Sequence, residues 1–372
     1  MKIGILTFHY MINQGSVLQA YCVNRLLQNK FPNAEIEIID LVPKNRGNAE
    51  KKYYKKKPPF VNIDFLAKFI SVRKFLKSRV KFSPFCDSID LEKQVDFINA
   101  QKYDMIFTGS DTVWMDSEKL NHVLPHIYFL PEGIKSKKNS IAASMDPLKS
   151  KERYFNAKLE ISNTLNFYDH ILVRDKISFD LINELGVLNV HQIADPTILF
   201  PFEKDLKLRM EKRGNILKKK VHISFGDKKM KSTIQSLLSQ TGLFELPEFK
   251  EESHFLRGDH IIDYLNEYAD IEVLITDRFH RSIFALKLSS ALVINVEHYL
   301  KNPTLNSKGR DLFNKIGFPE YCIRYDKGKE VDLLDSILFL IQNWDVEQFK
   351  KRENQIEKFI KENQNFWNSL NF

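Results

Sequence analysis

A histidine stands close to two arginines and an aspartate in the segment Ile271–Leu288, IEVLITDRFHRSIFALKL. Residues 271–275 are apolar and predict a short buried strand. Apolar side chains then recur at helical spacing, which predicts a helix whose first turn is capped by Thr276 or Asp277. The charged residues therefore lie where a strand gives way to a helix N-terminus. Such an edge of an α/β sheet binds ligands and favours anions.

The residue types at this edge fit proton transfer to an anionic substrate. Histidine is the residue type best suited to serve as an acid near neutral pH, and His280 supplies one here. Arg278 and Arg281 flank it and would attract phosphate or carboxylate groups. The simpler alternative is that His280 packs or caps while both arginines face water. The segment alone leaves both interpretations open.

Polar residues follow several other apolar runs in the same manner. They are Asn13, Gln14 and Gly15; Gly109, Ser110 and Asp111, with Trp114 close behind; Ser144; Arg174 and Asp175; and Asp195. Turns after strands are often polar, so no single one of these groups is specific. Their recurrence in this order is more specific, and we interpret them as ligand-binding residues at strand ends.

The elements around these residues alternate between strand and helix. Residues 2–8 and 35–41 are predicted strands with a helix over 17–29 between them, which is a βαβ opening without the GxGxxG dinucleotide motif. Further strands are predicted at 103–108, 140–144, 170–173 and 190–193, with a helix over 150–167. A second alternation begins with a strand at 220–225, and helices over 331–343 and 346–370 close the chain.

This pattern predicts an α/β fold with two Rossmann-like domains facing a cleft. We expect an N-terminal domain over 1–200, with a basic insertion near 43–82, and a linker or crossover over 201–220. A C-terminal domain over 221–345 and a C-terminal helix over 346–372 follow. At 372 residues the chain is long enough for two domains.

The basic residues are unevenly distributed in a chain whose formal net charge is +8. Residues 44–81 contain thirteen Lys and Arg against two acidic residues. The part from 63 to 80 is also apolar at helical spacing, so it fits either an anionic membrane surface or packing on its own domain. Zinc-finger spacing and an RNA-binding strand signature are both missing from the sequence, and we expect no nucleic-acid partner.

The sequence also bounds the compartment. It contains no apolar run of the roughly 18–20 residues that span a membrane, and its N-terminus does not resemble a signal peptide. Cys22, Cys86 and Cys322 are scattered, without the spacing of a metal site or a disulfide framework. We therefore expect a cytoplasmic protein without a metal, peripherally attached to the inner face of the plasma membrane if the basic segment binds lipid.

Five motifs together resemble the polysaccharide pyruvyl transferase family. The opening MKIGILTFHYMINQGSVLQAYCVNRLL resembles the family's Asn-x-Gly-x-x-Leu-Gln-Ala-Tyr start, and IFTGSDTVW its Gly-Ser-Asp-x-x-Trp motif. LVRDKISFDLINELG is similar to its Val-Arg-Asp motif, IADPTILF to its Asp-Pro-Thr motif and ITDRFHRSIFAL to its Thr-Asp-x-Phe-His motif. The resemblance runs from residue 1 to about 320 in family order. Arg278 and Arg281 depart from it, because the family commonly has Ser and a small residue there.

The resemblance implies a GT-B-like fold and transfer of pyruvate from phosphoenolpyruvate onto a sugar, usually as a ketal across two hydroxyls. It implies catalytic roles for His280 and Arg174. The other strand-end residues then bind substrate: Asn13, Gln14, Gly15, Gly109, Ser110, Asp111, Ser144, Asp195, Thr276, Asp277, Arg278 and Arg281. No cofactor is implied beyond phosphoenolpyruvate as donor substrate. The acceptor would be a saccharide, carried on a polyprenyl lipid in many members, in cell-surface polysaccharide synthesis. Two alternatives stay open: a nucleotide-sugar-dependent glycosyltransferase of the same fold, and a catalytically silent relative that binds glycan or membrane.

Overall fold

The computed structural model describes residues 1–44, 63–116, 123–146, 151–210, 218–249, 260–298, 307–326 and 328–372. These residues divide into two compact units, which are described one at a time. Unit 1 comprises residues 1–200 together with 365–372, and unit 2 comprises residues 201–364. Within the described residues, no helix is both long enough and apolar enough to cross a membrane.

Unit 1 contains a parallel sheet that has, in its described part, seven strands in the order β3-β2-β1-β4-β5-β6-β7. The order runs outward from β1 to β3 on one side and from β4 to β7 on the other, as in a doubly wound fold. The topological switch point, where ligands bind in such sheets, therefore lies at the carboxyl ends of the paired strands β1 and β4. The strands are β1 Lys2–Leu6, β2 Glu35–Ile38, β3 Lys81–Phe82, β4 Met105–Thr108, β5 Lys137–Ser140, β6 Tyr168–Val173 and β7 Val190–Gln192.

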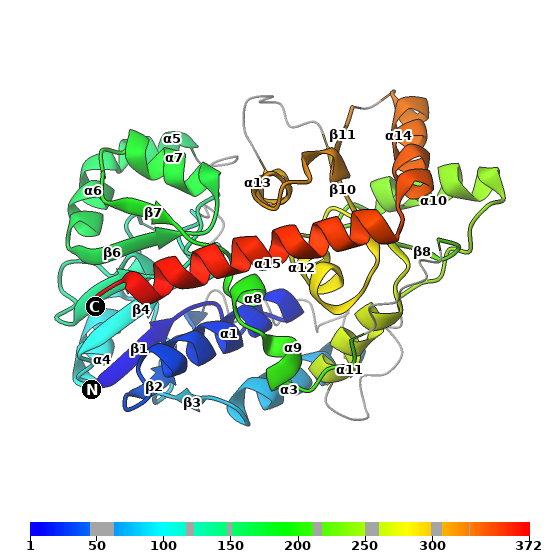
Figure 1. Ribbon diagram of the computed structural model, residues 1–372. Coiled ribbons are helices and arrows are strands. Elements are labelled where there is room, and N and C mark those ends of the chain that lie inside the picture. Colours follow the sequence, from blue (N-terminus) through cyan, green and yellow to red (C-terminus); the bar gives the residue numbers. More distant parts are fainter. Residues whose placement is uncertain are drawn as a thin grey trace. The chain divides into compact units, whose positions relative to one another are not determined.

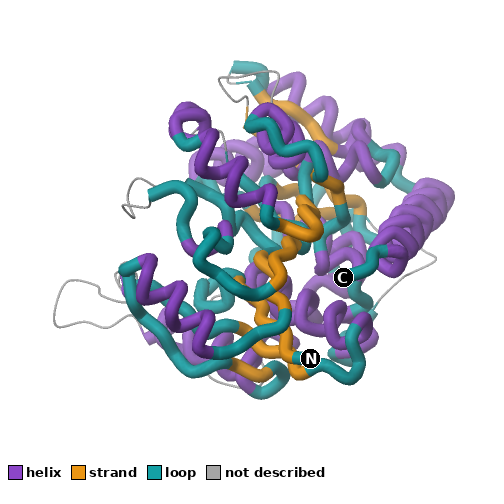
Figure 2. The backbone as a smooth tube through the Cα atoms, turned by 90° about the vertical axis from the view of Figure 1, so that its left-hand side faces the viewer, coloured by secondary structure: helices purple, strands orange, loops and turns teal. Residues whose placement is uncertain are grey.

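Helices connect the strands of unit 1 and cover its sheet (Figures 1 and 2). They are α1 Gln14–Lys30, α3 Ile63–Lys77, α4 Leu91–Ala100, the 3-10 turn η2 Ile127–Phe129, α5 Lys151–Asn156, α6 Lys158–Asn166, α7 Lys176–Glu184 and α8 Pro196–Leu199. The helix predicted over 17–29 begins earlier because the Asn13 side chain accepts the backbone N–H of Gly15 and caps it. The helix predicted over 150–167 is two helices, which break at Ala157.

The strand predicted at 140–144 was placed too late in the chain. β5 is Lys137–Ser140, and its Lys138 is buried although lysine is rare in a central strand. The Nζ of Lys138 donates to the carbonyl of Pro131 at 2.9 Å and lies 5.3 Å from the centre of the Phe167 ring. The aliphatic stem thus fills an apolar space while the ammonium group is hydrogen-bonded. A hydrophobic pattern cannot reveal such a lysine as a strand residue.

Unit 2 contains a smaller parallel sheet, of four strands in its described part, in the order β11-β10-β9-β8. The strands are β8 Val221–Ser224, β9 Val273–Thr276, β10 Leu292–His298 and β11 Cys322–Tyr325. The helices and 3-10 turns are α9 Phe202–Asp205, α10 Lys228–Thr241, α11 His260–Glu267, η4 Tyr268–Asp270, α12 Phe279–Leu288, α13 Lys308–Lys315, η5 Pro319–Tyr321, α14 Glu330–Asn343 and α15 Val346–Ser369. The predicted linker 201–220 contains α9, and its residues 211–217 lie outside the described part of the chain.

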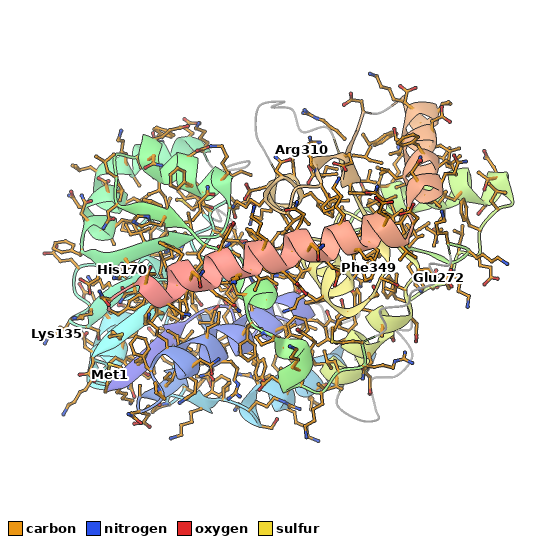
Figure 3. All side chains as sticks on the ribbon, viewed as in Figure 1. Met1, Lys135, His170, Glu272, Arg310 and Phe349 are labelled. Carbon is orange, nitrogen blue, oxygen red and sulfur yellow. The ribbon has the colours of Figure 1, made fainter. Side chains whose placement is uncertain are left out.

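The last residues of the chain return to unit 1 although α15 begins in unit 2. The Nζ of Lys30 donates to the carbonyls of Trp367, Asn368 and Leu370 at 3.1, 2.9 and 2.9 Å, which satisfies acceptors at the helix end. His170, labelled in Figure 3 beside this end of α15, contacts the Phe372 ring at 4.7 Å. The C-terminal helix predicted over 346–372 is therefore shared between both units.

Helix α3 carries the described part of the basic segment; residues 45–62 and the side chains of 63–68 lie outside the described residues. Val72, Phe75 and Leu76 are buried, and the Phe75 ring meets the Tyr21 ring edge-on at 5.5 Å. The apolar face that the sequence offered to a membrane therefore packs, in its described half, on unit 1. A charged face remains outside, with Lys74 and Lys77 exposed.

A partly buried ion pair joins α3 to the sheet. Asp40 follows β2, and its Oδ1 lies 2.9 Å from Nε2 of His9 and 3.6 Å from Nη2 of Arg73 on α3. Burial raises the pKa of the Asp40 carboxyl, but the hydrogen bond and charge of His9, together with Arg73, bring that pKa below its ordinary value.

Candidate functional site

In unit 1, a group of candidate residues lies at the switch point of the sheet, where α1 begins and β4 ends. The Oγ of Ser16 donates to Oδ2 of Asp111 at 2.6 Å, and the backbone N–H of Thr112 donates to Oδ1 at 2.7 Å. Asp111 has a φ of 84°, a left-handed conformation that is strained for a residue with a side chain. The chain thus accepts backbone strain to hold one carboxylate at the ligand-binding edge of the sheet.

Gly109 makes this turn sterically feasible. Its φ is 114°, and a Cβ at this position would lie 2.3 Å from the carbonyl oxygen of Ile141. Only glycine fits such a close approach between two backbones. The role of Gly109 is therefore to let the end of β4 turn, and it contributes no side chain to the site.

Arg174, at the end of β6, is surrounded by carboxylates. Its Nη1 donates to Oδ2 of Asp195 at 2.8 Å, and its Nε lies 3.8 Å from Oδ2 of Asp175. The Nε2 of Gln19 donates to the same oxygen of Asp195 at 2.7 Å. Burial lowers the pKa of Arg174, but the charges of Asp195, Asp111 and Asp175 outweigh burial and raise it. The positive charge of Arg174 is therefore compensated within unit 1. Because three carboxylates surround one guanidinium, the group keeps a net negative charge.

Ser144 belongs to the same network. Its Oγ donates to Oδ2 of Asp175 at 2.5 Å, while Oδ1 of Asp175 accepts both the N–H and the hydroxyl of Ser178 and so caps α7. Asp195 caps α8 in the same way through Thr197. Two of the predicted aspartates thus hold helix N-termini in place as well as the arginine.

Some buried polar atoms in this region have no hydrogen-bond partner within the described residues, among them Nε2 of Gln14, Oε1 of Gln19 and Oγ of Ser110. The exposed fractions of these residues are 8%, 0% and 0%. An unsatisfied buried polar group costs about 1–3 kcal/mol, so a group of them needs an explanation such as a bound ligand or water. Glutamine and serine side chains suit a ligand that bears hydroxyl groups.

In unit 2, a separate group of candidate residues lies at the end of β9. Both oxygens of Asp277 accept the backbone N–H of Gly226, at 2.9 and 3.1 Å. The Oγ1 of Thr276 donates to the carbonyl of Ser224 and accepts the N–H of Arg278. The expectation that Thr276 or Asp277 caps the helix is wrong: α12 begins at Phe279, and its N-cap Arg278 makes no side-chain cap. The carboxylate of Asp277 is used instead to hold the turn after β8.

The cationic residues of unit 2 are held by different contacts. The Cζ of Arg281 lies 4.5 Å from the centre of the Phe249 ring and 5.9 Å from that of Tyr264, within cation–π range. The His280 ring meets Phe279 edge-on at 5.3 Å and is stacked near Phe284 at 6.2 Å. No acidic residue lies in the first turn of α12, so this edge keeps the anion preference of a helix N-terminus.

The structure brings the predicted residues together in two groups, one in each unit. Unit 1 collects those that follow β1, β4, β5, β6 and β7, and unit 2 collects Thr276–Arg281. Sequence reasoning missed their supports, which are Ser16, Gln19, Ser178, Thr197, Gly226, Phe249 and Tyr264. Gln19 stands in the recognised opening motif and could have been found there, whereas Phe249 and Tyr264 give no such signal. Among the described residues, no group of three or more His, Cys, Asp or Glu side chains is arranged to hold a metal ion.

Comparison with known proteins agrees with the motifs. A family model described as polysaccharide pyruvyl transferase matches residues 13–289, which is most of the chain. A search among curated proteins gives no match.

Solved structures are similar in fold at low sequence identity. The apo form of the lipopolysaccharide outer core galactosyltransferase WaaB is 11% identical, with 99% of each chain covered and a TM-score of 0.51. A TarM mutant from S. aureus, in complex with Fondaparinux, alpha-GlcNAc-glycerol and UDP, is 12% identical over 99% of this chain and 100% of that chain, with a TM-score of 0.50. The UDP-GlcNAc 2-epimerase from Neisseria meningitidis bound to UDP-GlcNAc is 10% identical over 98% and 99%, with a TM-score of 0.48. The predicted GT-B-like α/β fold is confirmed by the first two, while the cleft between its domains stays a prediction.

Proposed function

The chain belongs to the polysaccharide pyruvyl transferase family, and we propose that it transfers pyruvate from phosphoenolpyruvate to hydroxyl groups of a saccharide. The observation that supports this most is the opposite charge of the two strand-end groups. The group in unit 1 has three aspartates around one arginine, whereas the group in unit 2 has Arg278 and Arg281 beside a single aspartate. A reaction between an anionic donor and a hydroxylated acceptor needs both kinds of surface.

The donor is assigned to unit 2. Phosphoenolpyruvate carries a phosphate and a carboxylate, and guanidinium groups at a helix N-terminus favour both. His280 stands between the two arginines in the chain and is the proposed acid. It gives a proton to the methylene carbon, which leaves a cationic centre at the carbon that carries the phosphate. A saccharide hydroxyl then forms the new C–O bond and loses its proton. Phosphate leaves with the electron pair of its bond to this carbon, which restores the cationic centre. A second hydroxyl adds to that centre and loses its proton, which completes a ketal.

The saccharide is assigned to unit 1. Sugar hydroxyls donate to carboxylates and amide oxygens and accept from amide N–H groups, and Asp111, Gln14, Gln19 and Ser110 offer such atoms. The resemblance implies a catalytic role for Arg174, and the expected form of that role is a grip on the phosphate or carboxylate of the donor. The burial of Arg174 among carboxylates favours a positioning role instead, in which it fixes Asp195 and Asp175 at the edge of the sheet.

The test is release of phosphate from phosphoenolpyruvate, with a panel of free, nucleotide-linked and polyprenyl-linked saccharides as acceptors. Phosphate release that depends on one acceptor, with a product heavier by one pyruvyl group, is the expected result. Nucleotide release from a nucleotide sugar, without consumption of phosphoenolpyruvate, would identify a glycosyltransferase instead. If the saccharide binds but neither phosphate nor nucleotide is released, the protein is a catalytically silent relative.

A further inference from the structure

The side chain of Arg278 is held against the backbone of a neighbouring turn. A Cβ built on Gly226 would lie 2.6 Å from Nη2 of Arg278, 2.7 Å from Cζ and 3.2 Å from Nε. These distances are too short for a real Cβ, so the guanidinium occupies space that exists only because residue 226 is glycine. The amino group Nη1 lies farther from this Cβ position than the three atoms named.

Asp277 fixes both partners of this contact. Its carboxylate accepts the N–H of Gly226 through both oxygens, and its Oδ1 lies 3.5 Å from Nε of Arg278. The aspartate is thus hydrogen-bonded to the turn after β8 and paired by charge with the arginine after β9. The ion pair is made by Nε, and the terminal amino groups of the guanidinium carry further N–H donors.

This arrangement is unusual for a surface arginine. The side chain of Arg278 is 56% exposed, and an exposed arginine ordinarily moves among many rotamers and loses side-chain entropy when it is fixed. Here the ion pair with Asp277 favours one position before any ligand arrives, and the missing side chain of Gly226 leaves that position open. A preset guanidinium binds an oxyanion more tightly, because less entropy remains to be lost on binding.

We propose that Gly226, Asp277 and Arg278 form a preset oxyanion receptor at the end of β9, with Gly226 and Asp277 as positioning residues and Arg278 as the binding residue. The inference deepens the proposed function, on which the identity of the ligand rests. The oxyanion is a phosphate or carboxylate group, either of the phosphoenolpyruvate donor or of an acidic saccharide acceptor. The predicted specificity thus includes a negative charge close to His280.

The experiment compares Arg278→Ser, Gly226→Ala and the double variant by calorimetric titration with phosphoenolpyruvate and with inorganic phosphate. Arg278→Ser should raise the Kd about tenfold, as expected for a lost charge-assisted contact. Gly226→Ala should raise it severalfold, because the methyl group displaces the guanidinium. The double variant should be no weaker than Arg278→Ser alone, since both changes remove one interaction. Arg278→Lys should recover only part of the affinity, because lysine lacks the planar fork.

Controls separate binding from folding and from general charge. Lys358→Ser removes one positive charge from the exposed face of α15 and should leave each Kd unchanged. Thermal unfolding of Gly226→Ala should match that of the wild-type protein, since the displaced group is the end of a flexible side chain.

A second arm identifies the source of the oxyanion. If Arg278→Ser leaves the Kd of both probes unchanged but raises KM for an acidic saccharide and not for a neutral one, the receptor binds the acceptor. Three outcomes would show that the receptor does not exist. In the first, neither the Kd of the probes nor the KM of the saccharides changes in Arg278→Ser. In the second, the wild-type protein binds neither probe nor any acidic saccharide, and in the third the effects of Arg278→Ser and Gly226→Ala on the Kd are additive. Loss of phosphate binding in Arg278→Ser, in a protein that never releases phosphate from phosphoenolpyruvate, would support the receptor and reject pyruvyl transfer.

Discussion

The two strand-end groups occupy equivalent places in two parallel sheets but are built in opposite ways. In unit 1 Arg174 and the two aspartates that it contacts, Asp175 and Asp195, are buried, and the side chain of Arg174 is 4% exposed. In unit 2 Arg281 is half-exposed and stacks on aromatic rings. Arg278 is exposed and lies against the backbone of Gly226. The same edge geometry can therefore carry either a rigid carboxylate network or an open cationic surface. The choice depends on which residues follow each strand.

The largest effect should come from the proposed acid in unit 2. His280→Ala should lower turnover by ~10²–10⁴-fold, because the methylene carbon loses its proton donor. The Kd of phosphoenolpyruvate measured by calorimetry should change little. Retained turnover in the purified variant would show that another residue donates the proton. It would also weaken the functional contrast between the strand-end groups of unit 1 and unit 2.

Stability should separate the two arginines. Arg174→Met leaves Asp195 and Asp175 buried without their cation, and the free energy of unfolding should fall by about 3–5 kcal/mol in urea denaturation. Arg278→Met is the matched control, and it should change that free energy by less than about 0.5 kcal/mol because its side chain is exposed. Equal stability of the two variants, with donor affinity lost only in Arg174→Met, would restore the expectation that Arg174 grips the donor.

Mild acid should also affect the two units differently. In unit 2, burial lowers the pKa of His222 to about 4, although the charge of Glu272 counteracts this. An unfolded histidine titrates near pH 6.5, so the unfolded state takes up a proton first and unit 2 loses up to roughly 3 kcal/mol as pH falls from about 6.5 to 4. In unit 1 the pKa of Asp40 is lowered, so its charged form stabilises the folded state. This stabilisation is fully present above the unfolded pKa of about 3.9 and is lost only as the pH falls below that value.

Hydrogen exchange at pH 7.0 and 4.5 would measure this difference. Strands of unit 2 should lose protection at the lower pH while those of unit 1 keep it. His222→Gln should make the stability of unit 2 less dependent on pH over this interval. Equal loss of protection in both units would show that His222 does not determine the acid response.

The smallest effect concerns α3 of unit 1, whose charged face lies outside the buried network. Ile70, Lys74 and Lys77 are exposed at helical spacing, and each basic residue near an anionic lipid surface is worth roughly 1 kcal/mol. We predict salt-sensitive binding to anionic but not to neutral vesicles, weakened in Lys74→Glu/Lys77→Glu. The matched control, Lys358→Glu/Lys361→Glu on α15, should bind as the wild-type protein does. Equal recovery in the supernatant with both vesicle types at low salt would leave α3 as a solvated helix.

Sequence reasoning succeeded where position along the chain determines position in space. Asp111, Arg174 and Asp195 gather because each follows a parallel strand of one sheet, and that rule needs no knowledge of packing. It failed for the partners of these residues. The hydrogen bond from the Gly226 N–H to Asp277 and the cation–π contact of Arg281 with Phe249 depend on how distant segments pack. The hydrophobic periodicity of the sequence does not encode that packing. The buried Lys138 misplaced a strand for the same reason, since its stabilising contacts are made with Pro131 and Phe167.

The contact between Lys30 and the end of α15 has a mechanical consequence. Because residues 365–372 belong to unit 1, unit 2 is a loop of chain that both leaves and re-enters the same body. A force applied between Met1 and Phe372 is borne first by unit 1 and by the hydrogen bonds that Lys30 donates to α15. It reaches unit 2 only after the terminal segment detaches. In a single-molecule pulling experiment, Lys30→Ala should therefore lower the force of the first rupture and leave the later extension of unit 2 unchanged.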